Sequence, residues 1–441
     1  MGGFAKTQEI MKRVAITTFG CKVNQYESAC IIEDFEKEGY VQVPFNEEAD
    51  VYIVNSCTVT NRTDFKVRNA IRKALEQKKK NRDVKIAVTG CYAQLNRERI
   101  YKMGEVDLVV DNNHKDSIVD FLYKTETPLF VEDTSSFETF TEQNTANLLD
   151  RARAFIKIQD GCDYFCTYCT ISYARGKPRS RKLEEVLKQV EVFLEKGYQE
   201  IVLTGVNLGL YGRDFAIDEN LLCVLQELER YDKLKRVRLS SLEPQLINDE
   251  LIDFFVQSEK VCPHFHIPMQ SGSDSVLKAM NRPYDTADFA GLINKLVKGI
   301  PNVAIGTDII LGFPTENDSL FQETIEFVES LPLVYAHIFP FSSRPGTQGA
   351  LLKNNTPSNV VKERCSTIKH IFDSKKEKYI DALVENNVQI SGIIESKNGK
   401  YWTALSDHYI RLFCKNEELE IGELFTGVVK NRLFDGVEVT V

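Results

Sequence analysis

The stretch Gly161-Cys162-Asp163-Tyr164-Phe165-Cys166-Thr167-Tyr168-Cys169 holds three cysteines at C-x3-C-x2-C spacing. It directly follows residues 155–158, a short apolar run that predicts a buried strand. A loop this tight brings three thiolates onto three irons of one [4Fe–4S] cluster. No fourth cysteine lies nearby, so one iron is left open to a small molecule. A structural zinc site is the alternative, but such sites are closed by four ligands at short spacing.

Composition indicates a soluble globular protein. The 441 residues are 43% hydrophobic and 27% charged, which predicts about three domains with sizeable cores. No apolar run is long enough to span a membrane, and residues 1–13 lack the apolar core of a signal peptide. Eleven cysteines, an odd number, favour a reducing, cytoplasmic compartment and metal chemistry over disulfides. The net charge of −9 restricts any nucleic-acid site to a local patch.

Three further cysteines share one local pattern in the first 120 or so residues. Apolar runs at residues 14–19, 51–54 and 86–89 end close to Cys21, Cys57 and Cys91, and helical stretches at residues 28–39 and 62–78 lie between them. Alternating strands and helices predict a doubly wound α/β domain with a parallel sheet. The carboxyl ends of parallel strands meet at one crevice, so we expect the three thiols to converge there. We interpret them as ligands of a second [4Fe–4S] cluster; ordinary buried cysteines are the alternative.

Strands and helices alternate again after residue 153. Candidate strands lie at residues 155–158, 200–204, 236–240, 264–269, 303–312 and 336–341. Six units are too few for a complete eight-stranded barrel, so they predict a partial (β/α)6 barrel with chemistry at the carboxyl ends of its strands. His264 and His266 alternate along one strand and share a face, where hydrogen bonding in the barrel interior is a simpler interpretation than metal ligation.

The last part of the chain has a different pattern. Five short strands separated by polar turns follow residue 378, which predicts a small antiparallel β-barrel of the OB type. We therefore expect an N-terminal domain over residues 12–122, a polar linker over 123–148, a core domain over 149–377 and the small barrel over 378–441. Basic residues crowd two stretches, residues 66–85 and 175–182, where they form either an ordinary solvated face or a phosphate-binding patch for nucleic acid.

Two three-cysteine sets in this order resemble the methylthiotransferases of the radical SAM superfamily. Gly20-Cys21-Lys22-Val23-Asn24 is similar to the branch that acts on threonylcarbamoyladenosine in tRNA, and the stretches at residues 204–207, 238–244, 264–272 and 343–347 fit the same family. The turn Gly312-Phe313-Pro314-Thr315-Glu316-Asn317 departs from the family's usual Gly-Phe-Pro-Gly-Glu-Thr.

The resemblance implies a cytoplasmic transferase with two [4Fe–4S] clusters and S-adenosylmethionine on the open iron of the Cys162–Cys169 loop. It implies that the cosubstrate contacts are Tyr168, Thr204, Asn207, Ser240 and Glu243, although loop geometry also explains Glu243. The product would be 2-methylthio-threonylcarbamoyladenosine next to the anticodon, and the last barrel would be the RNA-binding TRAM module. A tRNA anticodon loop, an external electron donor and a sulfur source are the expected partners of a monomer. Beyond the six cysteines, the sequence marks no catalytic residue.

The carboxylate of a threonylcarbamoyl group needs a cationic partner when it is buried, and arginine provides two parallel hydrogen bonds. Lys22, Arg175 and Arg344 lie near the cysteine loops or in the family stretches and are our candidates for substrate binding. Two other functions stay open at this point. One is the same chemistry on isopentenyl-adenosine, and the other is a non-catalytic iron–sulfur carrier.

Overall fold

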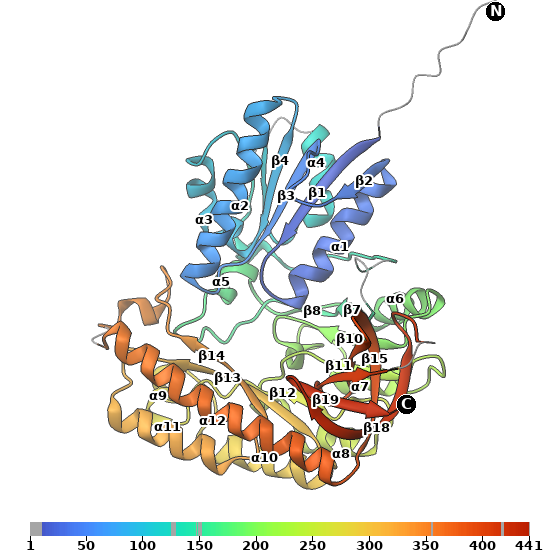
Figure 1. The fold of residues 1–441 in the computed structure, drawn as a ribbon. Coiled ribbons are helices and arrows are strands. Elements are labelled where there is room, and N and C mark those ends of the chain that lie inside the picture. The colour runs from blue at the N-terminus through green and yellow to red at the C-terminus, as the bar shows by residue number, and fades with distance from the viewer. Residues whose placement is uncertain are drawn as a thin grey trace, which may run out of the picture. The chain divides into compact units, whose positions relative to one another are not determined.

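The computed structural model describes residues 11–124, 129–146, 148, 152–353, 356–415 and 419–440. The chain divides into two compact units, both visible in Figure 1. The first unit comprises residues 1–147 together with Tyr173–Arg175, and the second comprises residues 148–172 and 176–441. Residues 1–10, which the sequence predicts to carry no export signal, lie outside the described part. Among the described helices, none combines the length and the apolar character needed to cross a membrane.

The first unit is built on a six-stranded sheet in which every neighbouring pair is parallel. Across the sheet the strands are β2 (Tyr40–Val43), β1 (Lys12–Thr18), β3 (Val51–Ser56), β4 (Lys85–Gly90), β5 (Leu108–Val110) and β6 (Leu129–Phe130). The chain runs from β1 outward to β2 and then returns to build the other half from β3, so the order reverses between β1 and β3. The predicted doubly wound sheet is confirmed. The sheet also extends through β6 into the predicted linker, of which residues 125–128 and 147 lie outside the described part.

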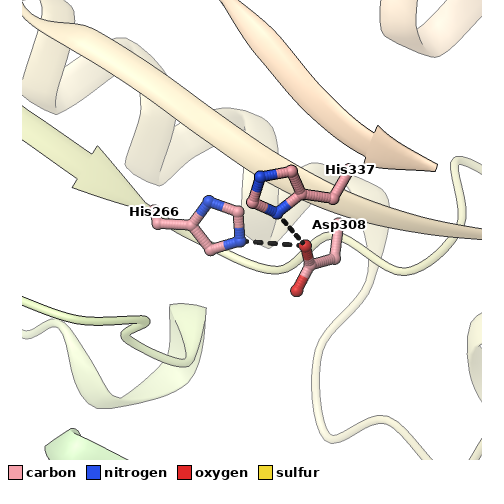
Figure 2. A group of neighbouring side chains, drawn as sticks. All are labelled: His266, Asp308 and His337. Atoms are coloured by element: carbon pink, nitrogen blue, oxygen red, sulfur yellow. Dashed lines mark hydrogen bonds and ion pairs between the residues drawn. The ribbon is translucent and has the colours of Figure 1, made fainter. Parts of the chain in front are cut away.

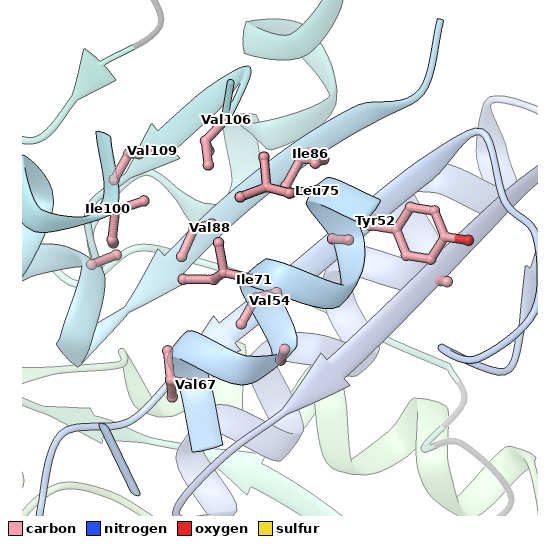
Figure 3. Close-up of a cluster of buried hydrophobic side chains, with 14 of the residues drawn as sticks. Tyr52, Val54, Val67, Ile71, Leu75, Ile86, Val88, Ile100, Val106 and Val109 are labelled. Carbon is pink, nitrogen blue, oxygen red and sulfur yellow. The ribbon is translucent and has the colours of Figure 1, made fainter. Parts of the chain in front are cut away.

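Helices cover this sheet, and their apolar faces are readable in the sequence. They are α1 (Lys22–Lys37), α2 (Asn61–Lys80), α3 (Cys91–Tyr101) and α4 (Ile118–Lys124). Helix α2 begins at Thr60, whose hydroxyl accepts a hydrogen bond from the Thr63 amide at 3.2 Å. Its residues Val67, Ile71 and Leu75 recur at four-residue spacing and pack into the core on the sheet, as Figure 3 shows.

The second unit contains the predicted partial barrel. Its six strands are β7 (Ala154–Lys157), β10 (Glu200–Thr204), β11 (Arg236–Leu239), β12 (His264–His266), β13 (Ala304–Leu311) and β14 (Tyr335–Pro340). They form two parallel three-stranded sheets, β11-β10-β7 and β12-β13-β14, and Val237 of β11 makes an isolated parallel bridge with Val261, shortly before β12. The six strands agree with the predicted ones to within a few residues, and no pairing joins β7 to β14 in the described part of the chain.

Further elements complete this unit. Its helices are α5 (Ile171–Arg175, shared with the first unit), α6 (Leu183–Glu195), α7 (Leu221–Leu228), α8 (Asp249–Gln257), α9 (Asp274–Ala279), α10 (Thr286–Gly299), α11 (Asp318–Ser330) and α12 (Ser358–Glu385). Short strands β8 (Gln159–Asp160) and β9 (Arg179–Ser180) pair antiparallel beside the cysteine loop. The 3-10 turns of the chain are η1 (Lys115–Ser117), η2 (Thr134–Ser136), η3 (Leu208–Leu210), η4 (Pro244–Leu246) and η5 (Gln348–Leu351).

The C-terminal part of the second unit is the predicted closed five-stranded barrel, although one of its strand pairs is parallel rather than antiparallel. Around the barrel the strands are β15 (Gln389–Asn398), β16 (Tyr401–Ser406), β17 (Arg411–Cys414), β19 (Gly436–Thr440) and β18 (Leu424–Leu433). Closure leaves no free sheet edge, which is how small β-barrels avoid edge-to-edge association. Its core contains residues of the barrel strands together with Ile380 and Leu383 of α12.

A buried charge cluster joins the partial barrel to the small barrel. Glu200 on β10 accepts hydrogen bonds from Nε of Arg236 (2.8 Å) and Nε of Arg238 (2.9 Å), and all three side chains are buried. The guanidinium groups also donate to main-chain oxygens of the small barrel, at Ser391 (3.1 Å) and Ser406 (2.8 Å). Burial raises the pKa of Glu200, but the two arginines outweigh it and bring the pKa to about 2.

We predict that Glu200→Gln destabilises the second unit by about 3–5 kcal/mol, because two buried guanidinium groups lose their counter-charge. Urea unfolding at neutral pH measures the change. Because the folded pKa is depressed, this stabilisation is complete above the ordinary pKa of 4.5 and disappears as the pH falls towards 2. The control is Glu227→Gln, which removes an exposed pair with Arg230 and should cost less than about 1 kcal/mol. Equal effects of the two variants would contradict the role of the cluster.

Candidate functional site

Three thiols of the first unit lie at the carboxyl ends of three neighbouring strands. Cys21 caps α1 after β1, Cys57 directly follows β3, and Cys91 begins α3 after β4. A methyl group on Gly20, whose φ is +100°, would lie 2.7 Å from Sγ of Cys57, so only glycine permits this approach. Burial, followed by the nearby Cys91 and Cys21 thiols, raises the pKa of Cys57 to about 12. The structure therefore brings the three predicted thiols together.

A buried ion-pair network adjoins these thiols. Glu27 on α1 accepts a hydrogen bond from Nη1 of Arg175 at 2.9 Å and forms an ion pair with Lys115. Arg175 also donates to the amide oxygen of Asn24 at 2.8 Å, and Lys115 to that of Asn55 at 3.3 Å. The Arg175, Lys115 and Glu27 side chains are at most 1% exposed. Burial lowers the pKa of Lys115, and the neighbouring Glu27 carboxylate opposes this effect.

The sequence predicts Lys22, Arg175 and Arg344 as substrate contacts. In the structure the three residues lie in different environments. Arg175 is held by Glu27 and Asn24 inside the first unit, together with the thiols. Lys22 is the first residue of α1 and is partly exposed, whereas Arg344 is buried in the second unit. The second basic stretch is not the surface patch that we expected, because Arg175, Arg179 and Arg181 are all buried.

The cysteine loop of the second unit follows β8. Gly161 has a φ of +80°, and a side chain there would collide with the main-chain oxygen of Lys177, so the loop requires glycine at its entrance. Three donors approach the sulfurs: Nη1 of Arg282 at 3.0 Å from Cys166, the Ile171 amide at 3.4 Å from Cys169, and Nδ2 of Asn207 at 3.9 Å from Cys162. Donors of this kind tune an iron–sulfur cluster through its sulfur atoms.

Arg282 is a functional candidate that the sequence analysis missed. Besides Cys166, its buried guanidinium contacts the hydroxyl of Tyr284 at 3.1 Å and forms an ion pair with Glu243. Glu243, a predicted cosubstrate contact, is thus linked to the cysteine loop through an arginine. No spacing or motif marked Arg282, which lies far in the sequence from Cys166 and Glu243.

The other predicted cosubstrate residues lie at the ends of two neighbouring strands. Thr204 ends β10 and is followed by Asn207, and Ser240 directly follows β11. Oδ1 of Asn207 and Oγ of Ser240 are buried, and neither has a hydrogen-bond partner among the described residues. Buried polar atoms are normally paired, so this place suits a polar ligand. Tyr168 lies within the loop itself, and burial holds its pKa well above the ordinary value.

The thiols themselves fit a metal cluster. Burial, followed by the neighbouring Cys166 thiol, raises the pKa of Cys169 to about 12, as the corresponding effects do for Cys57 in the other set. Such crowded thiols stay protonated at neutral pH unless positive charge is supplied. Metal ions supply it and displace the protons, which is how thiol sites couple metal binding to ionisation. Each unit therefore offers three grouped sulfur ligands that iron would ionise.

Comparisons with known proteins agree with this arrangement. The family described as "Uncharacterized protein family UPF0004" matches residues 13–111, and the Radical SAM superfamily matches residues 156–328. The two matches contain the first and the second cysteine set, respectively. Among solved structures, the radical S-adenosylmethionine methyltransferase TsrM from Kitasatospora setae is similar in fold, with a TM-score of 0.59, 13% identity and 77% coverage of each chain.

Curated relatives extend over nearly the whole chain. The threonylcarbamoyladenosine tRNA methylthiotransferase MtaB of Thermotoga maritima is 39% identical over 97% of this chain and 96% of its own. The tRNA-2-methylthio-N(6)-dimethylallyladenosine synthase of Alkaliphilus oremlandii is 33% identical over 94% of this chain and 89% of its own. Two grouped sets of three thiols, a radical SAM core and full-length relatives of this kind show that the chain belongs to the radical SAM methylthiotransferase family.

Proposed function

We propose that this chain adds a methylthio group to C2 of threonylcarbamoyladenosine in tRNA, next to the anticodon. The observation that carries the proposal is the pair of three-thiol sets, one in each unit, in a chain whose full-length relatives include enzymes named for this reaction. Two sets match two tasks. One task is to activate a carbon that has no acidic proton, and the other is to hold and deliver sulfur. A single-cluster carrier would need neither the second set nor the partial barrel.

Cys162, Cys166 and Cys169 are our proposed ligands of the first [4Fe–4S] cluster. When bound, this cluster and S-adenosylmethionine supply a 5′-deoxyadenosyl radical. The protein's own contribution is to position the cosubstrate and exclude water. Asn207 and Ser240 offer buried, unpartnered oxygens to it, Thr204 lies on the same strand end, and Tyr168 offers an aromatic ring. We assign Glu243 to this site through its ion pair with Arg282.

Cys21, Cys57 and Cys91 are our proposed ligands of the second cluster. Two of the three lie at helix N-termini, where the helix dipole favours a thiolate. Lys115 and Arg175 share Glu27 in a buried network, in which burial lowers the pKa of Lys115. A [4Fe–4S] cluster with three thiolate ligands carries about one negative charge in its oxidised state. A bound cluster of this charge would favour the protonated form of Lys115, as the neighbouring Cys91 charge does, and the protonated network would then balance it.

The substrate is a loop base, which is already unpaired and is cheaply turned into a pocket. We propose Lys22, Arg175 and Arg344 as the cations available to the threonylcarbamoyl carboxylate. Arg175 is the least available of the three, because Glu27 and Asn24 already occupy its guanidinium. The electron and the donated sulfur come from outside the chain.

The small barrel offers a surface suited to RNA. The Tyr401 ring has Nζ of Lys400 at 5.4 Å and Nζ of Lys415 at 5.1 Å from its centre. Phe434, which is 72% exposed, lies with its ring 6.3 Å from that of Tyr401. Aromatic rings flanked by lysines stack on bases and attract phosphates. These four residues support assigning an RNA-binding role to residues 378–441.

Mass spectrometry of nucleosides tests the substrate. Reconstituted protein with reductant, S-adenosylmethionine and a sulfide source should convert threonylcarbamoyladenosine in tRNA to its 2-methylthio form. It should leave isopentenyl-adenosine unchanged, because the apolar isopentenyl group has no carboxylate to pair with the cation of the pocket. The Cys21, Cys57 and Cys91 triple alanine variant is the control. It should still cleave S-adenosylmethionine and transfer no sulfur. Modification of isopentenyl-adenosine alone would identify the other branch of the family.

Iron content tests the ligand assignment. Anaerobically reconstituted protein should contain about eight irons per chain, from two clusters of four. Replacing Cys162, Cys166 and Cys169 by alanine should leave about four, and so should replacing the other three. Cys30→Ala is a matched control, since this buried cysteine lies inside α1 and away from the strand ends. Wild-type protein that saturates at four irons would exclude two clusters.

Charge balance at the second cluster gives a separate expectation. Lys115→Met removes one buried positive charge, which should lower the reduction potential of that cluster by on the order of 0.1 V for a charge within about 7 Å at an effective dielectric constant of about 20. The measurement is a redox titration followed by EPR in the Cys162, Cys166 and Cys169 triple variant, which isolates this cluster. Lys79→Met, an exposed lysine on α2, is the control. An unchanged potential in Lys115→Met would show that the network does not compensate the cluster.

A further inference from the structure

Three potential metal ligands meet in the second unit on neighbouring parallel strands. His266 lies on β12, Asp308 on β13 and His337 on β14. In the strand register His266 pairs with Gly306 and Asp308 pairs with His337. Since side chains alternate along a strand, His266 and the position two residues after Gly306 face the same side. Figure 2 shows the three side chains pointing towards one another.

Their spacing suits one small cation. Oδ1 of Asp308 lies 3.0 Å from Nε2 of His266 and 3.2 Å from Nδ1 of His337, and the three ligand atoms all lie within 4.8 Å of one another. Bonds of about 2.0–2.2 Å to zinc place neighbouring ligand atoms roughly 3.0–3.5 Å apart. Two of the three edges already have this length. Only a small rotation of an imidazole ring is needed to close the third.

Tyr335 and His264 orient the ring of His266 through the nitrogen that does not face Asp308. Nδ1 of His266 lies 3.3 Å from the hydroxyl of Tyr335, which in turn lies 2.8 Å from Nε2 of His264. His266 can donate its Nδ1 proton to Tyr335, and Tyr335 can donate its own to His264. This chain leaves Nε2 of His266 with a lone pair directed at Asp308. Metal-binding histidines are usually held in this way by the nitrogen that does not touch the metal.

The group is reachable from solvent on one side. The side chain of His337 is 55% exposed, that of Asp308 is 24% exposed and that of His266 only 9%. A cation could enter past His337 and keep water or another oxygen ligand on its open side. None of the six cluster cysteines belongs to the group, so an ion there would share no protein ligand with either proposed cluster.

We propose that His266, Asp308 and His337 bind one divalent transition-metal ion, such as Zn²⁺ or Fe²⁺, with at least one coordination position left open. Two imidazoles and one carboxylate form a donor set that such ions accept. A hydrogen-bonded triad without metal is the competing interpretation. It requires a proton on each nitrogen that faces Asp308, and a metal ion would replace both protons.

Zinc retention by the cluster-loaded, full-length protein tests the proposal. Protein is equilibrated anaerobically with zinc sulfate, passed over a desalting column, and analysed for zinc and iron by mass spectrometry. Wild type should retain about one zinc per chain with its iron content unchanged. His337→Ala and Asp308→Asn should each lower zinc affinity by at least about 100-fold, while Tyr335→Phe should lower it about 10–100-fold through the orientation of His266.

His370→Ala is the matched control, because His370 is an exposed histidine on α12 of the same unit. It should retain zinc like wild type. His337 is half exposed, so its alanine variant should fold even if Asp308→Asn does not. No zinc on wild type, equal retention by His337→Ala, or zinc gained in step with iron lost would each overturn the proposal. The last result would place the zinc at cysteines.

Discussion

Charge compensation of crowded thiols is the constraint on which both sites depend. Three cysteine sulfurs brought together inside a protein repel one another once ionised, and burial adds to the cost, as the raised pKa values of Cys57 and Cys169 show. Each unit answers this with positive charge. In the first unit Lys115 and Arg175 share Glu27, and in the second Arg282 reaches Cys166. Bound metal ions would complete the compensation. The sulfur spacing, the helix N-termini and the buried cations therefore all serve to hold ionised cysteine sulfurs close together.

Parallel strands explain how distant cysteines meet. Cys21, Cys57 and Cys91 lie far apart in the sequence, yet each follows one of three strands that are neighbours in the sheet, β1, β3 and β4. The sequence predicted this meeting because each apolar run ends in small or polar residues and a cysteine. It also predicted the six strands of the partial barrel and the five strands of the small barrel. Periodicity and turn residues are local signals, and these elements depend on them.

The partners of the cysteines were not predictable in the same way. Arg175 was predicted as a substrate contact, and that prediction stays untested, but its hydrogen bond with Glu27 on the first helix was not predicted. Arg282 and Lys115 were missed altogether. A basic residue in a loop looks the same in sequence whether it faces solvent or a buried carboxylate. Only the tertiary pairing, which no spacing encodes, distinguishes the two.

The polar character of several buried side chains in the partial barrel is explained by the barrel being open. A complete barrel fills its interior with layers of mostly apolar side chains, whereas the six strands here close no ring among the described residues. Several buried side chains on its strands are polar or charged and pair with one another, whereas Asn207 and Ser240 at the strand ends keep buried oxygens without partners among the described residues. Glu200, Arg236 and Arg238 pair and hold the small barrel, and next to them Tyr409 of the small barrel stacks on His264 at 4.4 Å between ring centres. Because buried polar groups are costly unless paired, this arrangement constrains both barrels together: the small barrel supplies the carbonyls and the aromatic ring that the open barrel lacks. The C-terminal barrel is therefore also a structural part of the core of the second unit.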